Sequence, residues 1–126
     1  MTYSISYNAE DHVIVCEFQG ELTVQTARDY FTEMVILAKE KNCGRILVDC
    51  RKSPLNISIL DLYQLPIVAQ SVQKKLDAED LVLWRAVVIN NDFGDHYFYE
   101  TVSQNRGFRV KMFLETQEAR EWLLAR

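Results

Sequence analysis

The chain contains few of the residues that build phosphate loops, metal centres or disulfide frameworks. Its 126 residues include four glycines, two prolines, two histidines and three cysteines. The glycines are dispersed, so neither a P-loop nor the glycine-rich fingerprint of a dinucleotide-binding fold is present. The cysteines are odd in number, show no CxxC spacing and accompany no recognisable export signal. We therefore expect reduced thiols in a cytoplasmic protein.

Basic clusters and long apolar runs are also missing. Eighteen acidic residues against fourteen basic ones give a net charge of −4, and the longest basic runs are Arg51-Lys52 and Lys74-Lys75. A chain with this balance repels a phosphate backbone, so we expect no nucleic-acid partner. Anionic membrane surfaces are disfavoured for the same reason. The longest apolar stretch, residues 34–38, is far too short to span a bilayer.

The composition that remains is that of an ordinary globular domain. Hydrophobic residues make up 48% of the chain and charged residues 25%. The length is close to the commonest size of a single domain, so residues 1–126 are expected to form one domain with one core. A core of this size needs no metal, cofactor or disulfide to be stable, and none is predicted.

Hydrophobic periodicity predicts alternating strands and helices after an N-terminal hairpin. Five stretches have the pattern of strands: residues 2–7, 12–18, 45–49, 84–89 and 108–113. Helices are expected after the capping residues Thr23, Ser58 and Thr116 and over residues 92–106, with a kink or break at Pro66. This order predicts an α/β fold with a five-stranded, mostly parallel mixed sheet, an N-terminal antiparallel hairpin and four helices.

Several short motifs, in this order and spacing, resemble those of the STAS domains, in particular the stand-alone SpoIIAA-like proteins related to anti-sigma-factor antagonists. The resemblance extends over nearly the whole chain. It is carried by Phe18-x-Gly20, Arg45-Ile46-Leu47-Val48-Asp49, Phe98-Tyr99-Glu100, Asn105-Arg106-Gly107 and Ala119-x-x-Trp122-Leu123. The resemblance implies a non-enzymatic regulatory module that binds another protein.

The resemblance also implies a phosphorylation switch. Antagonists of this type carry a serine at the start of the helix after the third strand, and a partner kinase phosphorylates it. Here the strand ends in Asp49-Cys50-Arg51, and the family's Asp-Ser-Ser/Thr-Gly motif is absent. The nearest candidates are Ser53 and Ser58. A helix N-cap is by itself a sufficient reason for a serine at position 58, and we favour that interpretation.

Two groups of residues are candidates for binding a ligand or partner. Asp49, Arg51, Asp92 and His96 follow strands whose carboxyl ends meet at one edge of a parallel sheet, where open α/β folds bind ligands. No spacing typical of a metal centre accompanies them. Phe93, Tyr97 and Tyr99 supply more aromatic residues than one helix face buries. They indicate either a wide buried helix or an apolar pocket or dimer patch.

Three functions remain open at this point. The first is a regulatory or protein-interaction module that acts as a homodimer or with a protein partner. The second is a carrier that binds a small, apolar, lipid-like ligand between helices and sheet. The third is an enzyme that uses Asp49, Arg51 and His96, although no catalytic motif is found. A deep pocket lined by tyrosine and phenylalanine would favour the carrier, and a flat apolar face beside the second helix would favour the interaction module.

Overall fold

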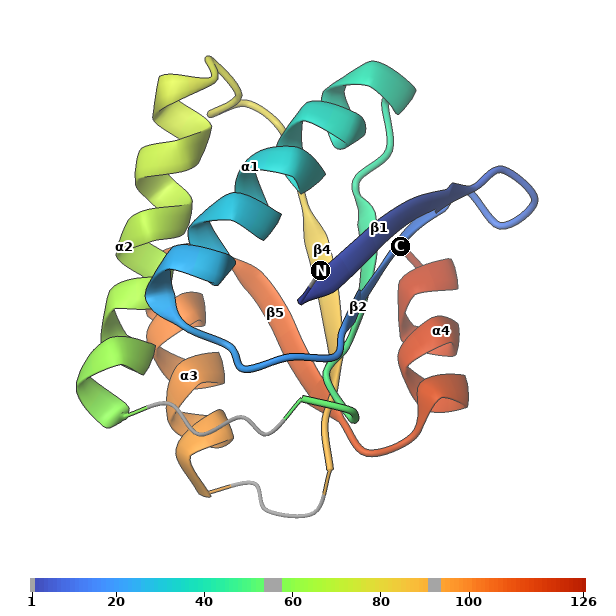
Figure 1. The fold of residues 1–126 in the computed structure, drawn as a ribbon. Helices are drawn as coiled ribbons and strands as arrows, with labels where there is room; N and C mark the ends of the chain where they lie inside the picture. Colours follow the sequence, from blue (N-terminus) through green and yellow to red (C-terminus); the bar gives the residue numbers. More distant parts are fainter. Residues whose placement is uncertain (1, 54–57, 91–93) are drawn as a thin grey trace.

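The computed structural model describes residues 2–53, 58–90 and 94–126, and the side chains of residue 59 and residues 94–98 are also outside the description. Five strands form one sheet in the order β1-β2-β3-β4-β5 (Figure 1). The strands are β1 (Tyr3–Asn8), β2 (Val13–Phe18), β3 (Arg45–Asp49), β4 (Trp84–Val88) and β5 (Arg109–Phe113). The helices are α1 (Val24–Lys41), α2 (Ile59–Lys75), α3 (Gly94–Asn105) and α4 (Thr116–Leu124).

The predicted fold class is confirmed. β1 and β2 are antiparallel, and β2 to β5 are parallel neighbours. The register aligns one row of small and medium apolar residues across the whole sheet: Ile5, Cys16, Val48, Val87 and Met112. Because the spatial order of the strands equals their chain order, each crossover helix returns to the adjacent strand. Crossovers of one hand then place all three helices on one face.

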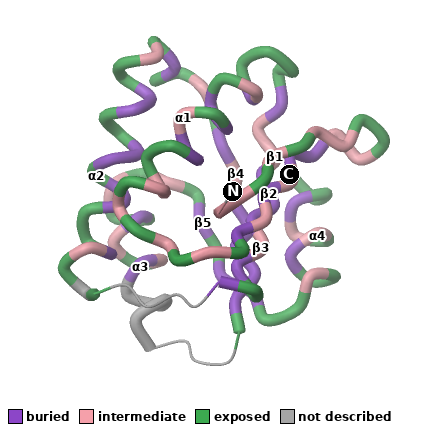
Figure 2. Tube along the Cα trace, in the orientation of Figure 1, coloured by how far each residue is buried: buried purple, intermediate pink, exposed green. Residues whose placement is uncertain are grey.

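The helices cover the two faces of the sheet unequally. α1, α2 and α3 lie over one face, and α4 alone lies over the other (Figure 1). The larger core cluster is under the three helices, and a smaller cluster under α4 contains Leu47, Ala86, Val88 and Leu123. Figure 2 shows that the central strands are mostly buried, and successive residues of β3 and β4 belong alternately to the two clusters, so buried residues line both faces. β3 and β4 are thus apolar on both sides and covered on both sides, as buried parallel strands require.

Most of the predicted helix boundaries are confirmed by local geometry. Thr23 accepts the Thr26 N–H at 3.1 Å in a capping box at the start of α1. α1 ends at Asn42, which adopts a left-handed conformation with φ of 49°. α3 is followed by Gly107 with φ of 86°, a conformation that glycine adopts without strain.

Two expectations about helices are corrected. α2 runs unbroken through Pro66, so of the predicted kink or break the break is wrong. Pro66 is fully buried among Leu62, Leu65 and Val68 of the same core-facing side, and this packing offsets the lost backbone hydrogen bond. At α4 the N-cap is Glu115, which makes no side-chain capping bond, and Thr116 is the first helical residue.

Candidate functional site

Asp49 and Arg51 lie at the carboxyl edge of the sheet and bind each other. The Arg51 Nη2 atom donates to Asp49 Oδ2 at 2.8 Å, and Nε donates to Oδ1 at 3.0 Å. The hydrogen bonds from the Arg51 side chain, the main cause, hold the pKa of Asp49 below its usual range. The Arg51 side chain is 44% exposed, so this is a surface ion pair between residues two positions apart. The structure thus places Asp49 and Arg51 together at the carboxyl edge of the sheet, where the sequence predicted them.

The two candidate serines have different surroundings. Ser58 is exposed, and its hydroxyl accepts the Asp61 N–H at 3.1 Å, which makes it the N-cap of α2. Ser53 is buried, and its hydroxyl donates to the Gly20 carbonyl at 2.8 Å. A kinase would therefore reach Ser58 more easily than Ser53. The capping role that we favoured for Ser58 is confirmed, whereas phosphorylation of either serine stays a prediction.

The remaining predicted site residues surround the start of α3. Asp92 and Phe93 lie outside the described residues. His96 and Tyr97 are in α3, but their side chains are likewise outside the description. Tyr99, the fifth candidate in this region, is buried and lines a cavity. Of the residues singled out from the sequence for ligand or partner binding, Tyr99 is the one that the structure places at an internal site.

That cavity lies between the sheet and the layer formed by α1, α2 and α3. Its volume is about 70 Å³. The walls are mainly aliphatic and aromatic: Phe18, Leu22, Ala27, Tyr30, Phe31, Val48, Cys50, Leu62, Leu65, Val68, Ala69, Arg85, Val87, Ile89, Tyr99 and Met112. Leu22 and Ala27 are only partly buried, so the cavity wall reaches the surface near the start of α1. The cavity has the tyrosine and phenylalanine lining that would favour the carrier, but it is small.

Arg85 is the charged residue in this wall. It lies on β4, is only 5% exposed, and its guanidinium carbon is 5.2 Å from the centre of the Phe31 ring and 5.9 Å from that of Phe108. Burial lowers the pKa of the guanidinium, but Tyr99 and Tyr30 raise it by more, so Arg85 stays protonated. Sequence reasoning treated residues 84–89 as an apolar strand and missed Arg85. The available signal was one arginine in an otherwise apolar internal strand.

The cysteines are free and buried, and Cys50 belongs to the cavity wall. Burial, the main cause, raises the pKa of Cys50 to about 12, with a further contribution from the charge of Asp49. Burial likewise raises the pKa of Cys16. Cys50 is thus a small core residue rather than an activated thiolate.

A second feature is an apolar stripe on the outward side of α2. Leu60 is 71% exposed, and Tyr63 and Ile67 are 45% and 41% exposed. Their spacing places them on one helical face, opposite the residues that line the cavity. The neighbouring exposed residues Gln64 and Gln70 are uncharged. This stripe corresponds to the apolar face beside the second helix that would favour an interaction module.

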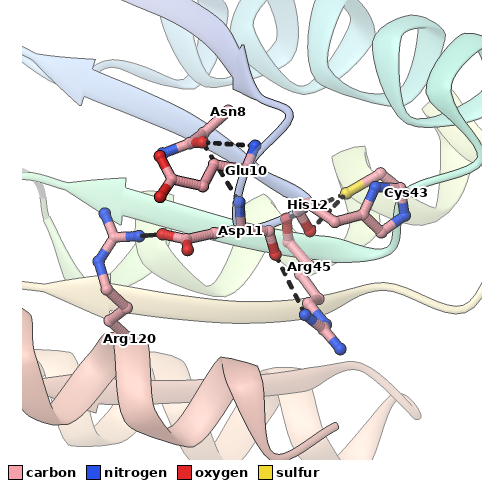
Figure 3. Close-up of polar contacts among 7 residues, drawn as sticks. All are labelled: Asn8, Glu10, Asp11, His12, Cys43, Arg45 and Arg120. Carbon is pink, nitrogen blue, oxygen red and sulfur yellow. Dashed lines mark hydrogen bonds and ion pairs between the residues drawn. The ribbon is translucent and has the colours of Figure 1, made fainter.

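A polar cluster at the opposite end of the sheet has a structural role (Figure 3). Asp11, in the turn between β1 and β2, pairs through its carboxylate with Arg120 of α4, and its carbonyl accepts Arg45 Nη1 at 3.2 Å. His12, at φ of 56°, contacts Tyr7 at 2.6 Å, and its carbonyl accepts the Cys43 thiol at 3.2 Å. Each of these groups already has a partner, and together they fix the hairpin turn to the segment between α1 and β3, to β3 and to α4.

Neither a metal centre nor a transmembrane helix is found in the described parts of the chain. No group of three or more His, Cys, Asp or Glu side chains there could hold a metal ion. Among the same residues, no helix is long and apolar enough to cross a membrane.

Comparison with known proteins assigns neither a family nor a function to the chain. No protein-family model matches the chain, and no curated protein matches it significantly. The resemblance to STAS domains therefore stays a prediction, and the function has to be argued from the cavity and the α2 stripe.

Proposed function

We propose that this protein is a non-enzymatic binding domain that holds a small apolar ligand between the sheet and α1, α2 and α3. The observation that carries the proposal is the cavity, whose aromatic and aliphatic wall is contributed by three helices and four strands. Ligand sites in proteins are commonly concave and mostly apolar, with a few polar groups that orient the ligand. Tyr30, Tyr99 and Arg85 are the polar side chains of this kind here.

The chemistry of the wall supports binding rather than catalysis. Burial keeps Cys50 as a neutral thiol at physiological pH, so it is a poor nucleophile. Asp49 and Arg51 are paired with each other at the surface and do not line the cavity. We further propose a cytoplasmic location, because three free cysteines suit a reducing compartment.

The cavity is tested by filling it. Ala69 lines the cavity and is 3% exposed, so Ala69→Leu places three additional carbon atoms there. The matched control is Ala125→Leu at the exposed C-cap of α4. With 1-butanol as a neutral probe, calorimetric titration should detect binding to the wild type and to the control, and a loss of at least tenfold in affinity for Ala69→Leu. Equal binding to all three proteins, or binding to none, would contradict the proposal.

A second candidate function is protein interaction through the α2 stripe, with a second copy of the chain as the occupant. Exposed Leu60 and Ile67 carry this candidate. Gln64 and Gln70 in this face are uncharged, but the Arg106 guanidinium lies 5.9 Å from the centre of the Tyr63 ring and donates to Gln70, so a two-fold interface would bring one positive charge from each copy close to it. Three side chains provide less than the roughly 800 Å² per partner of a standard stable complex, so we expect a weak dimer.

Light scattering over a range of micromolar concentrations tests this second candidate. The apparent mass should rise with concentration for the wild type, and Leu60→Gln together with Ile67→Gln should abolish the rise. Ile36→Gln, at a half-exposed position on α1, is the control and should leave it unchanged. A constant monomer mass for the wild type would exclude the dimer.

A further inference from the structure

Arg85 is a buried cation that lacks a described counter-ion. The ion pairs formed by the described residues are Arg51–Asp49 and Arg120–Asp11, and neither includes Arg85. The Arg85 Nη2 atom is fully buried and has no hydrogen-bond partner among these residues. An arginine cannot lose its charge at physiological pH, so burial cannot be relieved by deprotonation.

A second unpartnered group belongs to the same cavity wall. The Tyr30 hydroxyl is buried, and no described residue forms a hydrogen bond with it. Tyr30 and Tyr99 both favour the protonated guanidinium, through electrostatic and hydrogen-bonding contributions to its pKa, but the contact of the Tyr30 hydroxyl does not reach normal hydrogen-bond geometry. Two polar groups that line one cavity are thus both able to donate a hydrogen bond there. Buried polar groups are almost always paired in native proteins, so this arrangement requires an explanation.

The ring contacts of Arg85 do not provide that explanation. Phe31 and Phe108 face the guanidinium and interact with its positive charge through their π-systems. Rings in these positions stabilise the cation and limit its movement. They do not accept hydrogen bonds from the N–H groups, which point outward in the plane of the guanidinium. The Nη2 atom therefore remains available to an acceptor, and the planar fork of an arginine can offer a second N–H to an acceptor with two oxygens.

We propose that the cavity binds a small carboxylate, whose anionic group pairs with Arg85 and accepts a hydrogen bond from Tyr30 while its short hydrocarbon part contacts the apolar wall. This inference rests on the proposed function, because it names the ligand class of the same cavity. A single negative charge neutralises the single buried positive charge. The planar carboxylate matches the bidentate geometry of arginine. The mainly aliphatic and aromatic remainder of the wall selects for an apolar body.

The volume limits the size of that body. A cavity of about 70 Å³ is about half of the roughly 150 Å³ that accommodates benzene in an engineered apolar cavity. A carboxylate of two to four carbons is therefore expected, with the longer chains extending toward the partly buried Leu22 and Ala27, and long fatty acids should not fit without a rearrangement of the helices.

The experiment compares carboxylates with neutral molecules of the same shape. The protein is unfolded, refolded in carboxylate-free buffer, and titrated by calorimetry with straight-chain carboxylates from acetate to octanoate and with the corresponding primary alcohols. Arg85→Met removes the charge, and Tyr30→Phe removes only the hydroxyl. Arg109→Met, at an exposed position on β5, is the matched control. Circular dichroism verifies that each variant folds.

The expected result is that the wild type and Arg109→Met bind butyrate more tightly than 1-butanol. Arg85→Met should bind butyrate about ten- to hundredfold more weakly, as expected for loss of a charge-assisted hydrogen bond, and 1-butanol unchanged. Tyr30→Phe should lose less affinity for butyrate than Arg85→Met does, and its affinity for 1-butanol should not change. If Arg85→Met fails to fold, Arg85→Lys keeps the charge but not the fork and should still weaken butyrate binding.

Other outcomes separate the two proposals. If butyrate and 1-butanol bind the wild type and Arg85→Met equally, the cavity binds ligands but the role of Arg85 is wrong. If neither probe binds, both proposals fail. Inorganic phosphate at the same concentration should not compete with butyrate. Competition by phosphate that depends on Arg85 would show that the anion needs no apolar body and would overturn the ligand class.

Discussion

Both faces of the sheet have arginines stacked on aromatic rings, but the arginines are exposed to water on one face and buried on the other. Under α4, Arg126 lies over Trp84 and Trp122, and Arg109 lies over Trp84 from β5. Both of these arginines are exposed, so water solvates their charge. Under the three helices, Arg85 has similar ring contacts but is buried at a cavity. An arginine can therefore stack on aromatic rings while it stays exposed, so ring stacking does not explain why Arg85 is buried.

The comparison also distinguishes a packed core from one that can accommodate a ligand. The α4 face buries small and medium residues such as Ala86, Val88 and Leu123 against one short helix. The opposite face has a larger cluster that includes the cavity with the unpartnered Tyr30 and Arg85 atoms, whereas the unpartnered Thr116 hydroxyl of α4 lines no part of that cavity. We interpret the α4 face as the stabilising side of the domain and the three-helix face as its binding side.

The largest effect is expected on the α4 face. Trp122 contacts the rings of Trp84 and Phe113, so Trp122→Ala should lower the free energy of unfolding by about 3 kcal/mol, the lower end for loss of a packed tryptophan. Leu124→Ala, on the exposed side of the same helix, is the control and should cost about 0.5 kcal/mol or less. Chemical denaturation measures both. A near-neutral Trp122→Ala would show that α4 does not stabilise the sheet.

An effect of intermediate size is expected at the N-termini of α2 and α4, which belong to opposite faces of the sheet. Ser58 caps α2 through its hydroxyl, whereas Glu115 makes no side-chain capping bond at α4. Ser58→Ala should cost about 1 kcal/mol, and Ser58→Asp should be tolerated because aspartate is also a good cap. Glu115→Ala should cost no capping energy. Equal losses for the two alanine variants would contradict the assigned caps, and phosphate found on Ser58 in protein from its own cells would add a switch.

The smallest effect on stability is expected at Arg51, which is exposed and ion-paired, whereas Arg85 is buried and has no described counter-ion. Asp49→Asn breaks the surface ion pair with Arg51 and should cost about 0.2–1 kcal/mol because solvent screens it. The folded-state pKa of Asp49 is lowered, so its contribution is present above about pH 4 and is lost as the pH falls through the folded value. The difference between wild type and variant in unfolding experiments should therefore shrink below pH 4. A difference that grows there would contradict this sign.

The fold could be predicted because its signals are local. Alternating and helical periodicity, the Thr23 and Ser58 caps and the stop at Asn42 are each encoded within a few neighbouring residues. The exception at Pro66 arises because packing of the whole helix outweighs a local preference.

The candidate site was less accessible to sequence reasoning. The aromatic excess around α3 directed attention to Tyr99, which lines the cavity, but the cavity also requires residues from α1, α2 and β4, which only the tertiary structure brings together. The burial of Arg85 depends on Phe31 and Phe108, which are far away in the sequence. An arginine in a strand is equally compatible with an exposed face, as Arg109 shows.

The stability of Arg85→Met, refolded in carboxylate-free buffer, tests the central claim most directly. If Arg85 is held for a ligand rather than for the fold, methionine, which keeps an unbranched side chain in the apolar wall, should leave the free energy of unfolding unchanged or raise it by about 1 kcal/mol or more. Adding butyrate should then stabilise the wild type but not the variant. A loss of about 3 kcal/mol, as large as that for Trp122→Ala, would show that the ring and tyrosine contacts already satisfy the charge and would contradict the account.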